Sequence, residues 1–136
     1  MAFDTMPASI PQSMVRTIVS YAERRDQLGQ LRPANTNAAA IYTPRSVVTG
    51  YITHVIISNS GVGAVTYRLF HDKDGTTYDQ TTQLVWDESI AVAGSKLISY
   101  GDRGICIRYG GNFAVATGTA NDLTFTAYGY EEIVVQ

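Results

Sequence analysis

The most polar loop of the chain carries the side chains with the clearest potential to bind a metal ion. Asp72, Asp74 and Asp79 supply the hard oxygen ligands that calcium prefers, and the glycine after Asp74 permits a sharp bend. The spacing departs from an EF-hand loop, because that glycine follows the second aspartate directly and Gln83 stands at the twelfth position, where a glutamate belongs. The pattern favours an Asx-type turn between two strands, and a calcium site is the alternative.

Residues for acid–base or nucleophilic catalysis do not form a recognisable pattern. His54 and His71 are the two histidines, and neither lies in a known motif. The sequence has no G-x-S-x-G elbow and no phosphate-binding loop. Asp87 and Glu88 are adjacent, and neighbours in a strand point to opposite faces, so they do not form a glycosidase pair. We therefore expect a protein that is not an enzyme and has no cofactor.

Composition narrows the classes of partner. A net charge of −2 and a pI near 5.5 argue against nucleic-acid binding, which needs a surplus of basic side chains on one face. The single cysteine, Cys106, excludes an internal disulfide, and we expect a small buried side chain there. The N-terminus does not read as a secretion signal, and no run approaches the roughly 18 apolar residues of a membrane helix. We expect synthesis in a reducing cytosol and no membrane partner.

The pattern after Asn37 is typical of β-structure. Eight short segments rich in β-forming residues are separated by turn residues such as Asp74-Gly75. The predicted strands are Ala39–Thr43, Val48–Asn59, Val65–His71, Gln83–Asp87, Lys96–Tyr100, Ile105–Tyr109, Phe113–Thr117 and Leu123–Tyr130. The sequence therefore predicts an all-β fold, in which residues 38–136 form an antiparallel β-sandwich of about eight strands.

The second of these strands has apolar residues on both faces. Strict alternation places Val55 and Ile57 on one face and Ile52 and Ile56 on the other. A strand of this kind is expected to be covered twice, once by the core and once by an arm or another subunit. We therefore predict that Ile52 and Ile56 contribute to an assembly interface.

Residues 1–37 differ from the rest and are predicted to form an N-terminal arm. Three of the four prolines lie there, around one ordered piece at Ser13–Leu28. Spacings of three and four residues predict an amphipathic helix in this piece. The alternation of Val15, Thr17 and Val19 favours a strand instead, and the two alternatives stay open. The apolar residues assigned to the assembly interface here are Met14, Ile18, Tyr21 and Leu28.

Five runs of residues together make up one specific pattern of strands and turns. They are LRPANTN (31–37), IYTP (41–44), ITHVIISN (52–59), YRLFHDKDGTTYD (67–79) and ANDLTFTAYGYE (120–131). This pattern resembles a group of small virion structural proteins of tailed bacteriophages, over roughly Leu31 to Glu131. The resemblance implies a jelly-roll-like β-sandwich that is made in the bacterial cytoplasm and located on the virion.

Two functions follow from the resemblance. The first is a capsid decoration, or cement, subunit that binds the major capsid protein or other virion proteins through its arm and sheet edges. Closed symmetry would bury the apolar surfaces, and we expect a homo-oligomer with a trimer as the first choice. The alternative is a receptor- or glycan-binding module, or an adaptor, of the tail, fibre or neck, with polar side chains of the Asp72–Asp79 loop holding the ligand.

Overall fold

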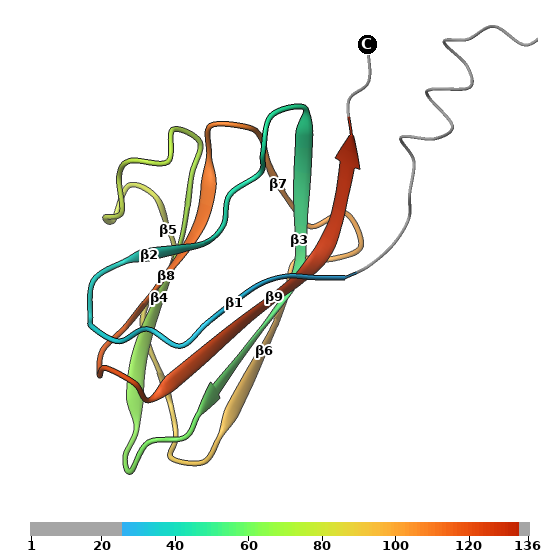
Figure 1. Cartoon of the computed structure of the whole chain (residues 1–136). Helices are drawn as coiled ribbons and strands as arrows, with labels where there is room; N and C mark the ends of the chain where they lie inside the picture. Colours follow the sequence, from blue (N-terminus) through green and yellow to red (C-terminus); the bar gives the residue numbers. More distant parts are fainter. Residues whose placement is uncertain (1–25, 134–136) are drawn as a thin grey trace, which may run out of the picture.

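The computed structural model describes residues 26–133, which fold into two antiparallel β-sheets packed face to face (Figure 1). This confirms the all-β sandwich, whereas the jelly-roll arrangement stays a prediction. The strands are β1 (Asp26–Leu31), β2 (Ala39–Tyr42), β3 (Val48–Asn59), β4 (Val65–Asp72), β5 (Gln83–Ile90), β6 (Ser95–Ser99), β7 (Ile105–Ile107), β8 (Asn112–Thr117) and β9 (Leu123–Ile133). Within residues 26–133 there is no helix that is long and apolar enough to span a membrane.

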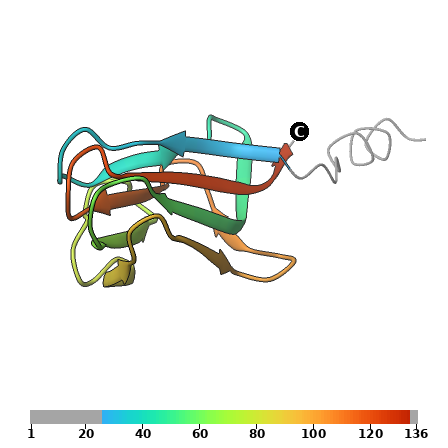
Figure 2. The same ribbon diagram turned by 90° about the horizontal axis from the view of Figure 1, so that it is seen from below.

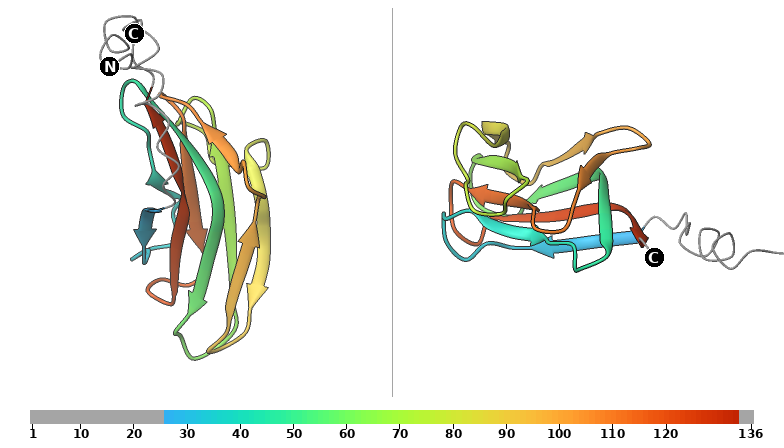
Figure 3. Two further views of the ribbon diagram at one scale, coloured as in Figure 1. Left: turned by 90° about the vertical axis from the view of Figure 1, so that its right-hand side faces the viewer. Right: turned by 90° about the horizontal axis from the view of Figure 1, so that it is seen from above.

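The strands divide into two layers. The first layer, sheet A, has the order β1-β9-β3-β6, and the short strand β7 also pairs with β3. The second layer, sheet B, has the order β2-β8-β4-β5. Figures 2 and 3 show the two layers from other directions. The long β3–β9 ladder runs from Val48↔Ile133 to Asn59↔Leu123 and forms the centre of sheet A.

The sandwich begins earlier in the chain than the sequence indicated. Residues 26–31 form β1, which pairs with β9 at the edge of sheet A. Leu28 and Leu31 pack against the core cluster, so this strand is held by apolar contacts as well as by its backbone pairing. The described end of the Ser13–Leu28 piece is therefore strand and not helix, and residues 26–37 belong with the sandwich. Residues 13–25 lie outside the described part.

The core fills the space between the two sheets. Its largest members, Tyr67, Phe113 and Phe125, are at most 1% exposed. Tyr67 and Phe125 meet edge to face, with ring centroids 6.4 Å apart, which joins the two sheets. Full burial of one such side chain stabilises the fold by about 1.5–3 kcal/mol. At one end, the Tyr42 ring lies against Gly50, where any Cβ would overlap it.

A β-bulge in β3 places Ile52 on the opposite face from the one predicted. The register with β9 shifts between Ile52 and His54, so Thr53 is an extra residue on this strand. The shift resets the alternation, and Ile52 then points to the same side as Val55 and Ile57, all 0% exposed in the core. The prediction that Ile52 lies at an assembly surface is therefore wrong.

Candidate functional site

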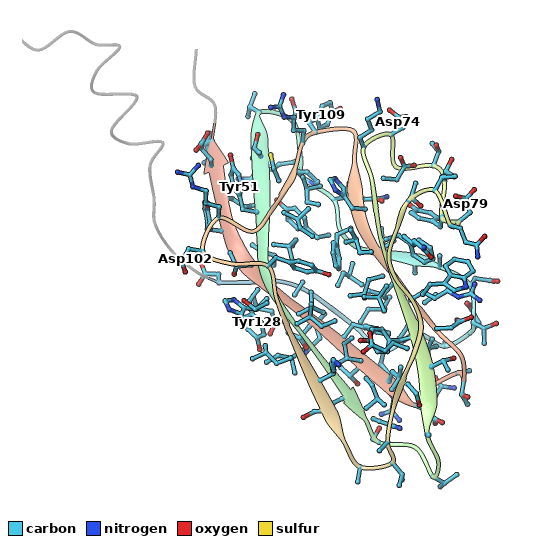
Figure 4. The ribbon with its side chains drawn as sticks, turned by 180° about the vertical axis from the view of Figure 1, so that it is seen from behind. Tyr51, Asp74, Asp79, Asp102, Tyr109 and Tyr128 are labelled. Atoms are coloured by element: carbon cyan, nitrogen blue, oxygen red, sulfur yellow. The ribbon has the colours of Figure 1, made fainter. Side chains whose placement is uncertain are left out.

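The outer face of sheet A, which points away from the core, is the candidate functional surface. Directly paired residues share a face, and the outward pairs are Tyr51↔Tyr130, His54↔Tyr128 and Ile56↔Leu97. We call these six residues the tyrosine face. Figure 4 labels two of them, Tyr51 and Tyr128, over the β3 and β9 strands.

Two tyrosines form a stacked pair on this surface. The rings of Tyr51 and Tyr130 have centroids 4.7 Å apart and an interplanar angle of 14°. The Tyr130 hydroxyl donates to the backbone carbonyl of Arg103 at 3.4 Å. Burial raises the pKa of Tyr51, and the nearby charge of Glu132 adds to this shift, so the phenol stays neutral at physiological pH. The pair is thus a preordered aromatic platform.

The rest of the surface is also poor in charge. Leu97 is 62% exposed beside the half-buried Ile56. Serine and threonine occupy the neighbouring outward positions, for example Ser58↔Thr124. Among the paired outward positions that the structure describes in sheet A, Glu132 is the one carboxylate, and there is no lysine or arginine. Depletion of charge together with aromatic side chains is typical of the centre of a protein–protein interface.

A groove of about 440 Å³ borders the tyrosine face at the β7 end. It is lined by Val47, Val48, Thr49, Tyr51, Cys106, Arg108, Tyr109 and Glu132. Tyr109 and Val47 are 67% and 59% exposed. Cys106 is half-buried and pairs with Tyr51, so it lies at the margin of the face and not in the deep core. The groove combines an exposed ring with one basic and one acidic side chain.

The outer face of sheet B is covered by the protein's own side chains. Phe70 and Ala114, on β4 and β8, are at most 1% exposed. Tyr78, from the loop between β4 and β5, and Trp86, from β5, each meet the Phe70 ring edge to face, with centroids 5.9 Å and 6.2 Å away. Arg68 lies 3.7 Å above the Trp86 ring. These groups form a second small core, which closes this face.

Arg68 also forms the principal ion pair on this side. Its guanidinium donates to both carboxylate oxygens of Asp87, at 2.7 Å and 3.0 Å. The pairing raises the pKa of Arg68 and lowers that of Asp87. The guanidinium is thus held by the carboxylate while its flat surface stacks on Trp86, which fixes the indole over Phe70.

The aspartates of the predicted calcium loop organise turns. The Asp72 carboxylate accepts backbone N–H groups from Asp74 at 3.1 Å, Thr76 at 2.8 Å and Thr77 at 2.7 Å. These bonds lower the pKa of Asp72. Asp79 accepts both the N–H and the hydroxyl of Thr81, which lowers its pKa.

The geometry of this loop fits the Asx-turn interpretation. Within the described part of the chain, no three His, Cys, Asp or Glu side chains come together to hold a metal ion. Figure 4 shows Asp74 and Asp79 on the loop, away from Tyr51 and Tyr128. The loop therefore lies away from Tyr51 and Tyr128, and the carboxylates of Asp72 and Asp79 accept hydrogen bonds from within the loop.

The two histidines lie in different surroundings. His54 is on the tyrosine face, and its Nδ1 is 3.0 Å from the Thr53 hydroxyl oxygen. His71 is half-buried in β4, and this burial lowers its pKa despite the adjacent charge of Asp72. The structure therefore places the histidines on different sheets and not in one site.

The structure separates the predicted interface residues. Ile56 lies on the tyrosine face, Ile52 is in the core, and Leu28 packs partly against that core. Met14, Ile18 and Tyr21 lie outside the described residues. The sequence interpretation missed the four other apolar or aromatic members of the face. Those members are Tyr51, Leu97, Tyr128 and Tyr130. Alternation along β9 is a signal that could have found Tyr128, because it lies on the opposite face from the buried Phe125 and Ala127.

Comparison with known proteins identifies no relative of this chain. No protein-family model, no curated protein and no solved structure matches it.

Proposed function

We propose that the protein is a non-enzymatic structural subunit that binds a neighbouring protein through the tyrosine face. The observation that carries this proposal is an aromatic, charge-poor outer face on sheet A, in a molecule whose other outer face is closed by its own side chains. Stacked tyrosines suit binding, because they present a large contact area with few side-chain torsions to freeze.

The more specific proposal is a cement subunit of a tailed-bacteriophage virion. The resemblance over Leu31 to Glu131 supports it, and the sandwich fold is compatible with it. The partner would be the major capsid protein or another virion protein, and the subunit would act as a homo-oligomer, with a trimer as the first expectation. Residues 1–25 would supply a further anchor beyond the sandwich.

The proposal is tested on phage particles assembled with variant protein. We expect Tyr128→Ser combined with Leu97→Ser to lower the number of copies per particle at least tenfold, measured by quantitative mass spectrometry. Buried aromatic anchors often contribute about 2 kcal/mol or more each to binding, which supports an effect of this size. Thr81→Ala, on the exposed β4–β5 loop, is the matched control and should leave occupancy unchanged. Normal occupancy of the double variant, or absence of the protein from purified particles, would contradict the proposal.

A test of the anchoring role of the N-terminal segment must preserve β1. Removal of residues 1–30 would delete most of an edge strand of sheet A, because β1 spans Asp26–Leu31. Deletion of residues 1–25 leaves that strand in place. We expect this shorter deletion to reduce particle occupancy, and undiminished occupancy would remove the segment from the binding mechanism.

The groove beside the face supports a second candidate function, which is glycan or receptor binding by a tail, fibre or neck component. Tyr109 offers an exposed ring, and Arg108 and Glu132 offer polar groups in the same groove. A glycan array with the wild-type protein and Tyr109→Ala tests this alternative. A ligand whose signal disappears in Tyr109→Ala would favour it, and an array without any signal would count against it.

A further inference from the structure

We propose that residues 14–21 of this chain bind across the tyrosine face of their own subunit. This inference rests on the proposed function in one respect, since it takes the same face as the binding surface. It adds an occupant for that face in the free subunit. On assembly the neighbouring protein would take the face, and the released segment would then serve as the further anchor, so its deletion would still lower particle occupancy.

The point where the chain enters the sandwich lies beside the face. Asp26 is the first residue of β1 and pairs with Gly129, and the flanking residues Tyr128 and Tyr130 point outward from sheet A. Residues 22–25 span up to about 13 Å when extended. Adjacent strands are about 4.8 Å apart. Residues 14–21 can therefore reach β9, β3 and β6 from this position.

The composition of the segment complements the face. Met14, Val15, Ile18, Val19 and Tyr21 place five apolar side chains within eight residues. The face offers aromatic and aliphatic side chains with little charge, so contact removes apolar area from water on both sides.

Charge at the end of β9 favours the same placement. Arg24 and Arg25 immediately precede β1 in the sequence. If the register that pairs Asp26 with Gly129 continued toward the N-terminus, these two arginines would approach the end of β9 that carries Glu132. Opposite charges at this edge would hold the segment beside sheet A.

The short linker favours occupation of the tyrosine face by the chain's own segment over occupation by the segment of a second copy. A short linker holds the segment near its own face at an effective concentration in the millimolar range. A second copy at micromolar concentration cannot compete unless it makes additional contacts. The free subunit is therefore expected to cover its own face.

The native cysteine provides a direct test. Cys106 is the one cysteine in the sequence, and it lies beside Tyr51 at the margin of the face. In full-length Ile18→Cys, mild oxidation should join positions 18 and 106 within one chain, as seen by non-reducing electrophoresis and peptide mass spectrometry. Full-length Asp4→Cys has the same tether but lies outside residues 14–21, and it should react at least tenfold more slowly.

Each alternative outcome overturns the proposal. Equal rates for the two variants would indicate a tether without a docking site, and cross-linked dimers would indicate that a second copy is the occupant. Absence of any disulfide, combined with unchanged amide exchange at Ile56 and Tyr128 in full-length Ile18→Asp relative to Thr5→Asp, would also overturn it. Faster exchange in Ile18→Asp is the expected result. These experiments use the free protein, so their failure is distinguishable from failure of the proposed function, which is measured as particle occupancy.

Discussion

The two outer faces of the sandwich differ in how they are covered. On sheet B, Phe70 is 1% exposed because Tyr78 and Trp86 pack over it. On sheet A, Leu97 is 62% exposed, and Tyr51 and Tyr130 stack on each other, with the Tyr130 hydroxyl donating to the Arg103 carbonyl of the β6–β7 turn. Apolar residues on an outer face therefore contribute to the fold where the chain's own side chains cover them, and they stay accessible where no such cover exists.

Loop length accounts for this difference. The β4–β5 connection, residues 73–82, is long enough to return Tyr78 across sheet B, where Asn112 donates to its hydroxyl at 2.6 Å. The connections that lead into or out of the sheet A strands β3, β6, β7 and β9 are shorter turns at the ends of the strands. The β6–β7 turn meets the Tyr130 hydroxyl through the Arg103 carbonyl, but none of these described turns carries a ring back over a buried ring of the face, as Tyr78 does over Phe70.

The largest expected effect on stability comes from removing the buried ring on the covered outer face of sheet B. Phe70→Ala should lower the free energy of unfolding by about 3–5 kcal/mol, because it removes a buried ring and leaves a cavity under Tyr78 and Trp86. Tyr128→Ala, on the open face, should cost about 1 kcal/mol or less. Chemical denaturation monitored by circular dichroism measures both. Equal losses would show that the two faces serve stability alike.

A smaller effect is expected from the anchor of the covering loop. Tyr78→Phe removes the oxygen that accepts from the Asn112 side chain and should cost about 1–3 kcal/mol, since a buried amide donor is left unpaired. Tyr109→Phe, in which the substituted residue is 67% exposed, is the matched control and should change stability by about 0.5 kcal/mol at most. If both variants were as stable as wild type, the loop would not depend on this contact.

Low pH should lower the stability of the fold on the sheet B side by protonating Asp72. Its folded pKa is depressed by three backbone N–H donors, so its contribution is fully present above the pKa of the unfolded chain and is lost as pH falls through the folded pKa. That window lies below about pH 4, given an ordinary aspartate pKa near 3.9. Thermal unfolding between pH 7 and pH 2 should show a steeper acid loss for wild type than for Asp72→Asn. Parallel curves would assign the acid dependence to other carboxylates.

The smallest effect on stability is expected on the open face. Leu97→Ser should change the free energy of unfolding by about 0.5 kcal/mol or less, because the side chain is already mostly in water. Burial of a leucine in a complex contributes about 1.5–3 kcal/mol, so particle binding should weaken roughly tenfold or more. Val92→Ser, on the β5–β6 turn, is an exposed apolar control that should bind normally. Equal binding by both variants would exclude Leu97 from the interface.

The sequence was informative where the signal is local. The alternation and the turn residues predicted eight of the strands, and the Asp72 turn was recognised from its own residues. β1 was missed, because Gln27 and Gln30 interrupt the apolar pattern and the preceding spacing suits a helix equally well. Pairing with β9, far away in the chain, selects the strand.

Local sequence is enough to predict the all-β class, the positions of most strands and the Asx turn after β4, because backbone preference and side-chain alternation act over a few neighbouring residues. Which apolar residues lie in the core and which on the surface depends on long-range packing. The bulge at Thr53 turned Ile52 inward and left Ile56 outward, and the β3–β9 register brought Tyr51 against Tyr130. Such a register depends on contacts between segments far apart in the chain, so local patterns do not encode the tyrosine face.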